Sequence, residues 1–236
     1  MKRGFYAIIV LVISLSVNAQ DNHYSQFYAN KIYLNPAFSG TGVCPRVILG
    51  FRDQWPGING EYVSYTASYD QSLNGLGFAV LFNGDDAGRG VLKTNNFSSI
   101  ISPKISLYQD FVLSFAVEAG IIQKHLDHSS FIFPEQIDQN GIIPNVSQEI
   151  NSNLNVLKPD ISSGILVYSP FLYMGYSVHH IMTPNISLLG EPNKEFLYRR
   201  HTAHVGANIP LYEPDPIKRR KGMMPKISPQ IIFQQQ

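Results

Sequence analysis

Hydrophobic and polar residues alternate along much of the chain, most regularly over residues 111–124. Phe115 and Val117 fall on one side of this segment, and Glu118 and Lys124 fall on the other. A period of two residues is typical of a β-strand with one apolar and one mixed face. We therefore predict a strand here.

The same alternation, looser in places, predicts eight further strands. Several are longer than the five or six residues that are commonest in soluble proteins, and they approach the roughly 9–11 residues of a membrane-spanning strand. Nine strands in succession predict an all-β protein. The eight segments are residues 47–55, 62–69, 76–82, 101–107, 160–168, 171–180, 197–209 and 225–235.

The connections between these strands differ in length, and from the third onward long and short ones alternate. Residues 83–96, 125–159 and 181–196 are long connections, whereas residues 109–110 and 169–170 are short ones. Outer-membrane barrels have long extracellular loops and short periplasmic turns. The alternation therefore favours a transmembrane antiparallel β-barrel over a soluble β-sandwich. The long, basic connection at 210–224 breaks the pattern.

In a membrane barrel the apolar side of each strand faces lipid and the mixed side faces the lumen. A spanning sheet must close because lipid offers no hydrogen-bond partners. We predict that Lys104, Glu118 and Lys124 face the lumen. Phe115→Arg on the lipid side should cost roughly 2–4 kcal/mol. Ala116→Arg on the opposite side should cost much less.

The N-terminus predicts export. Lys2 and Arg3 give a basic start, and residues 5–17 form an apolar run. Ala19 ends a V-x-A sequence that is typical of a signal-peptide cleavage site. The apolar run is shorter than the roughly 20 residues of a spanning helix, which argues against a membrane anchor. We predict a signal peptide at residues 1–19, a periplasmic or plug-like segment at 20–45, and the barrel at 46–236.

Composition excludes several classes of protein. Charged residues make up 15% of the chain and the net charge is +1. A nucleic-acid-binding protein would show a strong basic bias, so no nucleic-acid partner is predicted. The only cysteine, Cys44, excludes an intrachain disulfide and a cysteine-rich zinc site.

No catalytic motif occurs in the sequence, and the near matches are weak. Residues separated by one or three positions in a strand point to opposite faces, so paired histidines do not predict a metal site. Asp85 and Asp86 are expected at a glycine-rich loop tip, and Arg199 and Arg200 as rim charges. We predict no enzymatic activity, no catalytic residue, no cofactor and no metal. The histidine pairs are His125/His128, His179/His180 and His201/His204.

A short motif and an ordered set of segments resemble a known family. The motif is Tyr33-Leu34-Asn35-Pro36-Ala37, soon after the predicted signal peptide. The chain resembles the PorP/SprF family, outer-membrane proteins of the type IX secretion and gliding machinery of Bacteroidetes. The supporting segments are residues 51–56, 64–70, 76–88, 115–120, 159–168, 173–180, 199–206 and 226–233.

The resemblance implies a binding and anchoring component that supports export or surface anchoring of cargo such as adhesins. Its implied partners are outer-membrane lipid, the C-terminal sorting domain of the cargo, and other secretion-system subunits. Family members continue for several strands after the segment similar to 226–233. Since single-chain bacterial barrels have even strand numbers, we expect further C-terminal strands beyond Gln236.

Two other functions remain open at this point. A fatty-acid-channel-like transporter also carries an Asn-Pro-Ala segment near its plug, so Asn35, Pro36 and Ala37 do not separate the two readings. A hydrolase would need a serine, a histidine and an acid on one face. The expected partner surface is the connections at 125–159 and 181–196 or the barrel lumen, and the alternative for 125–159 is a seal over the barrel mouth. Its apolar candidates are Phe131, Phe133, Ile142 and Ile143.

Overall fold

A nine-stranded antiparallel sheet dominates the computed structural model. The structure describes residues 29–58, 60–108, 110–127, 137–138, 141–142, 154–188, 194–211 and 226–236. The strands of the sheet pair in chain order, so that each pairs with its neighbours in the sequence of the sheet and the first and last have one partner each. The strands are β1 (Arg46–Gln54), β2 (Tyr62–Leu73), β3 (Leu76–Ala87), β4 (Leu92–Tyr108), β5 (Phe111–Leu126), β8 (Asn155–Tyr168), β9 (Leu172–His179), β10 (Arg200–Ala207) and β13 (Gln230–Gln235).

The smaller elements lie outside this sheet. Two short hairpins pair β6 (Ile137–Asp138) with β7 (Gly141–Ile142) and β11 (Ile209–Pro210) with β12 (Lys226–Ile227). The helical elements are α2 (Lys31–Leu34) and η2 (Pro36–Phe38). No helix within the described residues is long and apolar enough to cross a membrane. The predicted signal peptide at 1–19 lies outside the described residues.

Each of the nine predicted strands corresponds to a strand of the sheet, but one predicted loop is wrong. Strands β3 and β4 continue through most of residues 83–96, so that only residues 88–91 connect them. Asn83 pairs with Asn96, and Asp85 pairs with Thr94 in this ladder. Asp85 and Asp86 therefore lie in a strand and not at a loop tip. Asp85 faces the concave side of the curled sheet, whereas Asp86 lies on the other face and accepts a hydrogen bond from the N–H of Gly90.

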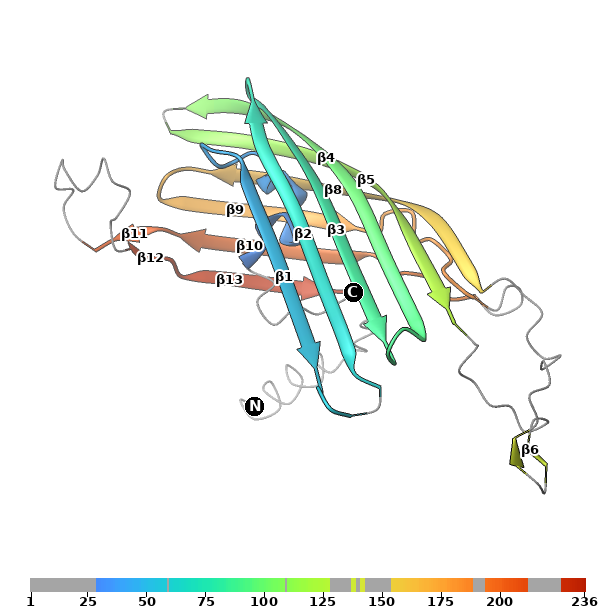
Figure 1. Cartoon of the computed structure of the whole chain (residues 1–236). Coiled ribbons are helices and arrows are strands. Elements are labelled where there is room, and N and C mark those ends of the chain that lie inside the picture. The colour runs from blue at the N-terminus through green and yellow to red at the C-terminus, as the bar shows by residue number, and fades with distance from the viewer. Residues whose placement is uncertain are drawn as a thin grey trace, which may run out of the picture.

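The sheet is strongly curled, and the helical segment lies inside the curl (Figure 1). We call the face that bears this segment the concave face. Along β5, Phe115 on the convex face is 47% exposed, whereas Ala116 on the concave face is 0% exposed. The large apolar residues of the convex face share this exposure. They include Leu49, Phe51, Phe97, Ile101, Val117, Ile121, Ile161, Ile165, Val205, Ile231 and Phe233.

The main core lies between the concave face and residues 30–41, which we call the N-terminal segment. Ile32 and Phe38 from this segment pack against small and aliphatic residues of the strands. Ala116 belongs to this core, where the N-terminal segment fills the space that an arginine would need, so Ala116→Arg should cost more than alternation alone suggests. The strand residues of the core are Ala79, Ile100, Ala116, Leu166 and Tyr173.

The two rims of the sheet differ, as the connection lengths predicted in part. Residues 74–75, 109–110 and 169–171 make tight connections on one rim. Asn74 and Gly75 have φ values of 47° and 84°, as a two-residue hairpin turn requires. The opposite rim carries the connections 55–61, 88–91, 127–154 and 180–199. The connection 208–229 lies on the same rim as the tight connections and is long, which is the exception that the sequence analysis noted.

Candidate functional site

Asn35 fixes the N-terminal segment to the sheet. Its Oδ1 accepts a hydrogen bond from the backbone N–H of Ala37 at 2.9 Å, which caps η2. Its Nδ2 donates to the carbonyl oxygens of Ile165 at 3.1 Å and Tyr176 at 3.4 Å, two residues that face each other in the β8–β9 ladder. Nδ2 also lies 3.0 Å from Nε2 of His204. The side chain therefore joins three strands.

Two glycines make room for this amide. A Cβ atom at Gly164 would collide with Oδ1 of Asn35, and one at Gly175 would lie 2.8 Å from its Nδ2. Both contacts are closer than van der Waals distance, so any larger residue would displace Asn35. The Asn-Pro-Ala motif and these two glycines, far apart in the sequence, form one structural unit.

Serine hydroxyls hold the backbone on either side of Asn35. Ser114 donates to the carbonyl of Ala37, and Ser177 donates to the carbonyl of Leu34, each at 2.9 Å. These carbonyls lie at the ends of short helical turns, where no later N–H satisfies them. These polar residues on the concave face thus form hydrogen bonds with the N-terminal segment instead of with solvent.

Predicted lumen residue Lys104 lies beside the end of this segment. Its ammonium group donates to the carbonyl of Gly40. The N–H of Gly40 in turn donates to Oδ2 of Asp70 at 2.9 Å, and Arg46 forms a two-bond ion pair with the same carboxylate. Lys104 is therefore on the concave face, where it helps fasten the N-terminal segment.

A cavity of about 250 Å³ lies between the N-terminal segment, the strands and the β9–β10 loop (residues 180–199). The ladder registers place Glu118 at its inner end and Lys124 toward the long-loop rim. These two predicted lumen residues line the same space. Further lining residues are Tyr33, Asn83, Asp85, Asn96, Ile122, Asp160, His179, His180, Ile186, Glu195, Leu197 and Arg200.

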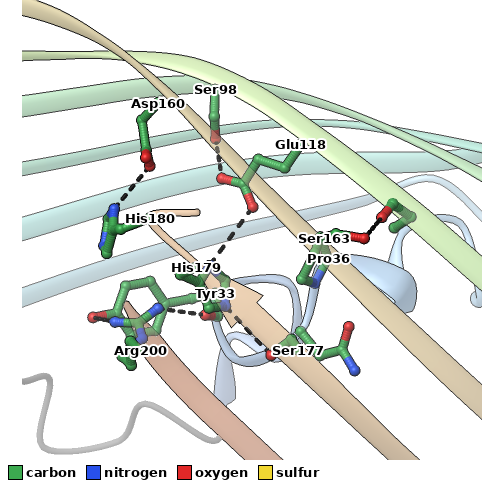
Figure 2. Close-up of polar contacts among 12 residues, drawn as sticks. Tyr33, Pro36, Ser98, Glu118, Asp160, Ser163, Ser177, His179, His180 and Arg200 are labelled. Carbon is green, nitrogen blue, oxygen red and sulfur yellow. Dashed lines mark hydrogen bonds and ion pairs between the residues drawn. The ribbon is translucent and has the colours of Figure 1, made fainter. Parts of the chain in front are cut away.

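Two carboxyl groups form the inner end of this cavity (Figure 2). Oε1 of Glu118 accepts from the hydroxyl of Ser98 at 2.6 Å, and its Oε2 lies 3.9 Å from Nδ1 of His179. Oδ2 of Asp160 lies 2.8 Å from Nδ1 of His180. Each carboxyl thus has one oxygen in a short hydrogen bond.

The histidine pair at 179 and 180 departs from the predicted arrangement. Both residues are buried on the concave side, with ring centroids 6.3 Å apart. The rule that neighbours point to opposite faces fails because β9 ends at His179, and His180 adopts a φ of 56°. This turn of the backbone brings its ring toward Asp160. His128 lies outside the described residues.

Arg200 is buried and makes internal contacts, so it is not the rim charge that the sequence predicted. Its Nη1 donates to the hydroxyl of Tyr33 at 2.8 Å, and its guanidinium group lies 4.6 Å from the centre of that ring. Tyr33 opens the Tyr-Leu-Asn-Pro-Ala motif, so the arginine ties this motif to β10. Its neighbour Arg199 donates to the carbonyl of Ile181 and stays exposed.

The β9–β10 loop covers the outer end of the cavity. Nζ of Lys124 donates to both carboxylate oxygens of Glu195 at 2.8 Å. Ile186 and Leu197 from the loop pack against Ile122 on β5. An ion pair and a small apolar cluster therefore hold the loop over the mouth of the cavity.

A serine, a histidine and an acid do meet on the concave face, as a hydrolase would need. Nε2 of His179 lies 3.5 Å from Oγ of Ser177, and its Nδ1 lies 3.9 Å from Glu118. Activated nucleophiles have hydrogen bonds of about 2.6–3.2 Å to their base. Ser177 instead donates to Leu34 and is fully buried beneath the N-terminal segment. The Ser177 hydroxyl thus binds the N-terminal segment.

The cavity was missed at the sequence level, although one signal was available. Asp160 and Ser162 alternate with exposed Ile161, which places them on the same side as the inward residues of β5.

The predicted partner residues Phe131, Phe133 and Ile143 lie outside the described residues. Ile142 falls in β7, and nothing is described of its side chain. Residues 125–126 and 155–159 belong to strands, so the predicted connection is shorter than expected.

Comparison with known proteins assigns the chain to a family. Residues 16–236 match the family described as type IX secretion system membrane protein PorP/SprF. Neither a curated protein nor a solved structure matches the chain. The match covers the N-terminal segment, all nine strands and the cavity. The chain therefore belongs to the PorP/SprF family of type IX secretion system membrane proteins.

Proposed function

We propose that this protein is an outer-membrane β-barrel component that supports export or surface anchoring of type IX cargo such as adhesins. The family match over residues 16–236 carries the proposal. The distribution of residues supports the membrane assignment, since large apolar side chains are exposed on the convex face while polar ones are buried inside. Lipid around the strands would remove that apolar surface from water.

The proposed organisation has a signal peptide at 1–19, a plug at 20–45 and a barrel from 46 onward. The basic start and the apolar run support the signal peptide. The contacts of Asn35, Ser114 and Ser177 support the plug, because they hold residues 34–37 within the curl of the sheet. Outer-membrane lipid and other secretion-system subunits would be the partners of such a barrel.

The protein would act by binding and anchoring. Its internal cavity is charged and hydrogen-bonded, which suits polar partners better than the hydrophobic cargo of a fatty-acid channel. The long connections between β5 and β8 and between β9 and β10 lie on one rim, which we assign to the cell exterior. This rim would meet the cargo, and the connection at 127–154 is the largest part of it.

The test replaces residues 129–145 with a short Gly/Ser linker in the full-length gene. Heat-modifiable gel mobility would report barrel assembly, and surface labelling would report cargo display. Normal assembly with lost display supports the proposal. A matched control replaces residues 212–224 on the opposite rim and should leave display intact. Normal display without residues 129–145 would exclude a required docking role for this connection.

A further inference from the structure

The cavity beneath the β9–β10 loop contains buried carboxyl oxygens that no hydrogen-bond donor of the described chain satisfies. Glu118 and Asp160 are each 6% exposed and line the cavity. Within the described part of the chain, Oε2 of Glu118 and Oδ1 of Asp160 have no hydrogen-bond partner. Buried carboxyl oxygens are costly without a donor, and such exceptions point to a group that the structure does not contain.

The charge of the lining selects the kind of donor. Four carboxyl groups face the cavity against two permanent cations, Lys124 and Arg200, which leaves a formal charge of −2 with neutral histidines. Lys124 is engaged by Glu195, and Arg200 is engaged by Tyr33. The remaining excess favours a cationic ligand. The described residues contain no group of three histidine, cysteine or acidic side chains placed to hold a metal ion, so an organic cation fits better.

The shape of the lining narrows this class further. Ile122, Ile186 and Leu197 form an apolar collar toward the rim, and the carboxyl groups of Glu118 and Asp160 lie deeper, toward the N-terminal segment. Lysine and arginine have this same order of groups: an apolar stem carries a charged head with several N–H donors. The cavity, about 250 Å³, far exceeds the roughly 10–15 Å³ that one water molecule requires.

The sequence of the same rim adds an independent argument. The connection 127–154 contains four acidic residues, Asp127, Glu135, Asp138 and Glu149, and no lysine or arginine. Its formal charge is therefore −4, with histidine neutral. Its negative charge would also raise the local concentration of a basic partner.

We infer that the cavity beneath the β9–β10 loop is a receptor site for a lysine or arginine side chain of a partner polypeptide. Glu118 and Asp160 bind the charged head, and the collar of Ile122, Ile186 and Leu197 holds the stem. The inference rests on the proposed binding role and specifies the chemistry of the partner.

Three small probes test this site on the full chain folded in detergent micelles, with binding followed by saturation-transfer NMR. Nα-acetyl-arginine methylamide presents stem and head, the citrulline analogue lacks the charge, and methylguanidinium lacks most of the stem. The arginine probe should bind at least about tenfold more tightly than either of the others, a difference of about 1.4 kcal/mol. Equal binding of the arginine and citrulline probes would overturn the inference.

Variants then locate the binding. Glu118→Gln and Asp160→Asn should each weaken the arginine probe about tenfold or more, whereas Asp110→Asn, an exposed acid in the β4–β5 turn, should leave it unchanged. Asn96→Trp fills the cavity from its wall and should abolish binding even if the acid variants fail to fold. Unchanged binding in Asn96→Trp would place the site elsewhere and refute the inference. Cargo display is measured separately, so a failed probe does not by itself refute the proposed secretion role.

Discussion

The two faces of the sheet carry opposite surfaces on the same strands. Along β5, Phe115, Val117 and Ile121 are exposed on the convex face, whereas Ser114 and Glu118 are buried on the concave face. A water-soluble sheet protein would bury its apolar face. Here the buried face is the polar one, and Ser114 on this face donates a hydrogen bond to the N-terminal segment. The convex face thus exposes apolar side chains, and the concave face contacts the N-terminal segment.

Asn35→Ala, which weakens the concave face, should change the free energy of unfolding most. The change removes a fully buried amide that contacts Ala37, Ile165, Tyr176 and His204, and each orphaned group costs roughly 1–3 kcal/mol. We expect a loss of about 4 kcal/mol in the free energy of unfolding, measured by denaturant titration in lipid vesicles. Gln123→Ala removes an exposed amide and should change it by less than about 0.5 kcal/mol. Similar values for the two variants would show that the concave face does not depend on this segment.

Phe115→Arg examines the convex face. If lipid surrounds this face, an arginine in the middle of the strand should cost roughly 2–4 kcal/mol, and Tyr108→Arg near the rim should cost about 0–1 kcal/mol. The same vesicle titration measures both. If water surrounds it, Phe115→Arg should be almost neutral, because Phe115 is already 47% exposed. A neutral result would contradict the membrane assignment.

Ser102 and Ser114 test how much single hydrogen bonds on the concave face contribute to stability. Their hydroxyl oxygens lie 2.7 Å apart, and Ser114 also donates to Ala37. Each alanine substitution should cost about 1 kcal/mol. The double mutant should cost less than the sum because the two share one bond. Ser99→Ala on the exposed face is the control and should have no measurable effect. Full additivity would mean that the two hydroxyls act independently.

Lys124→Met should have the smallest effect on global stability. Lys124 is 11% exposed and its partner Glu195 is 44% exposed, so water screens the pair and the loss should stay below about 1 kcal/mol. The β9–β10 loop should nevertheless open more often, which would appear as faster hydrogen exchange over residues 181–188. The charge-swapped pair, Lys124→Glu with Glu195→Lys, should restore protection. Unchanged exchange in Lys124→Met would mean that the apolar cluster alone holds the loop.

Local pattern predicted the nine strands well because each strand has one consistently apolar face. It failed between residues 83 and 96, where inward-facing Asn83, Asp85 and Asn96 resemble a polar loop. The faces of Glu118 and Lys124 followed from alternation alone. Alternation could have placed Asp160 on the inward face, but the cavity as a whole also depends on the turn at His180 and on pairing between strands distant in the sequence. The role of Asn35 likewise depends on Gly164 and Gly175, which no short motif connects.

The contacts of Asn35 have a consequence for the order in which the chain matures. This residue emerges early during synthesis and export, yet its partners Ile165, Tyr176 and His204 follow 130, 141 and 169 residues later. Closing such long loops is slow, and native contacts of this separation form late. We therefore expect this early segment to settle late. In a pulse-labelled chain, protease protection of residues 30–41 should appear only after β10 has paired, so their protection would report that β8, β9 and β10 have assembled.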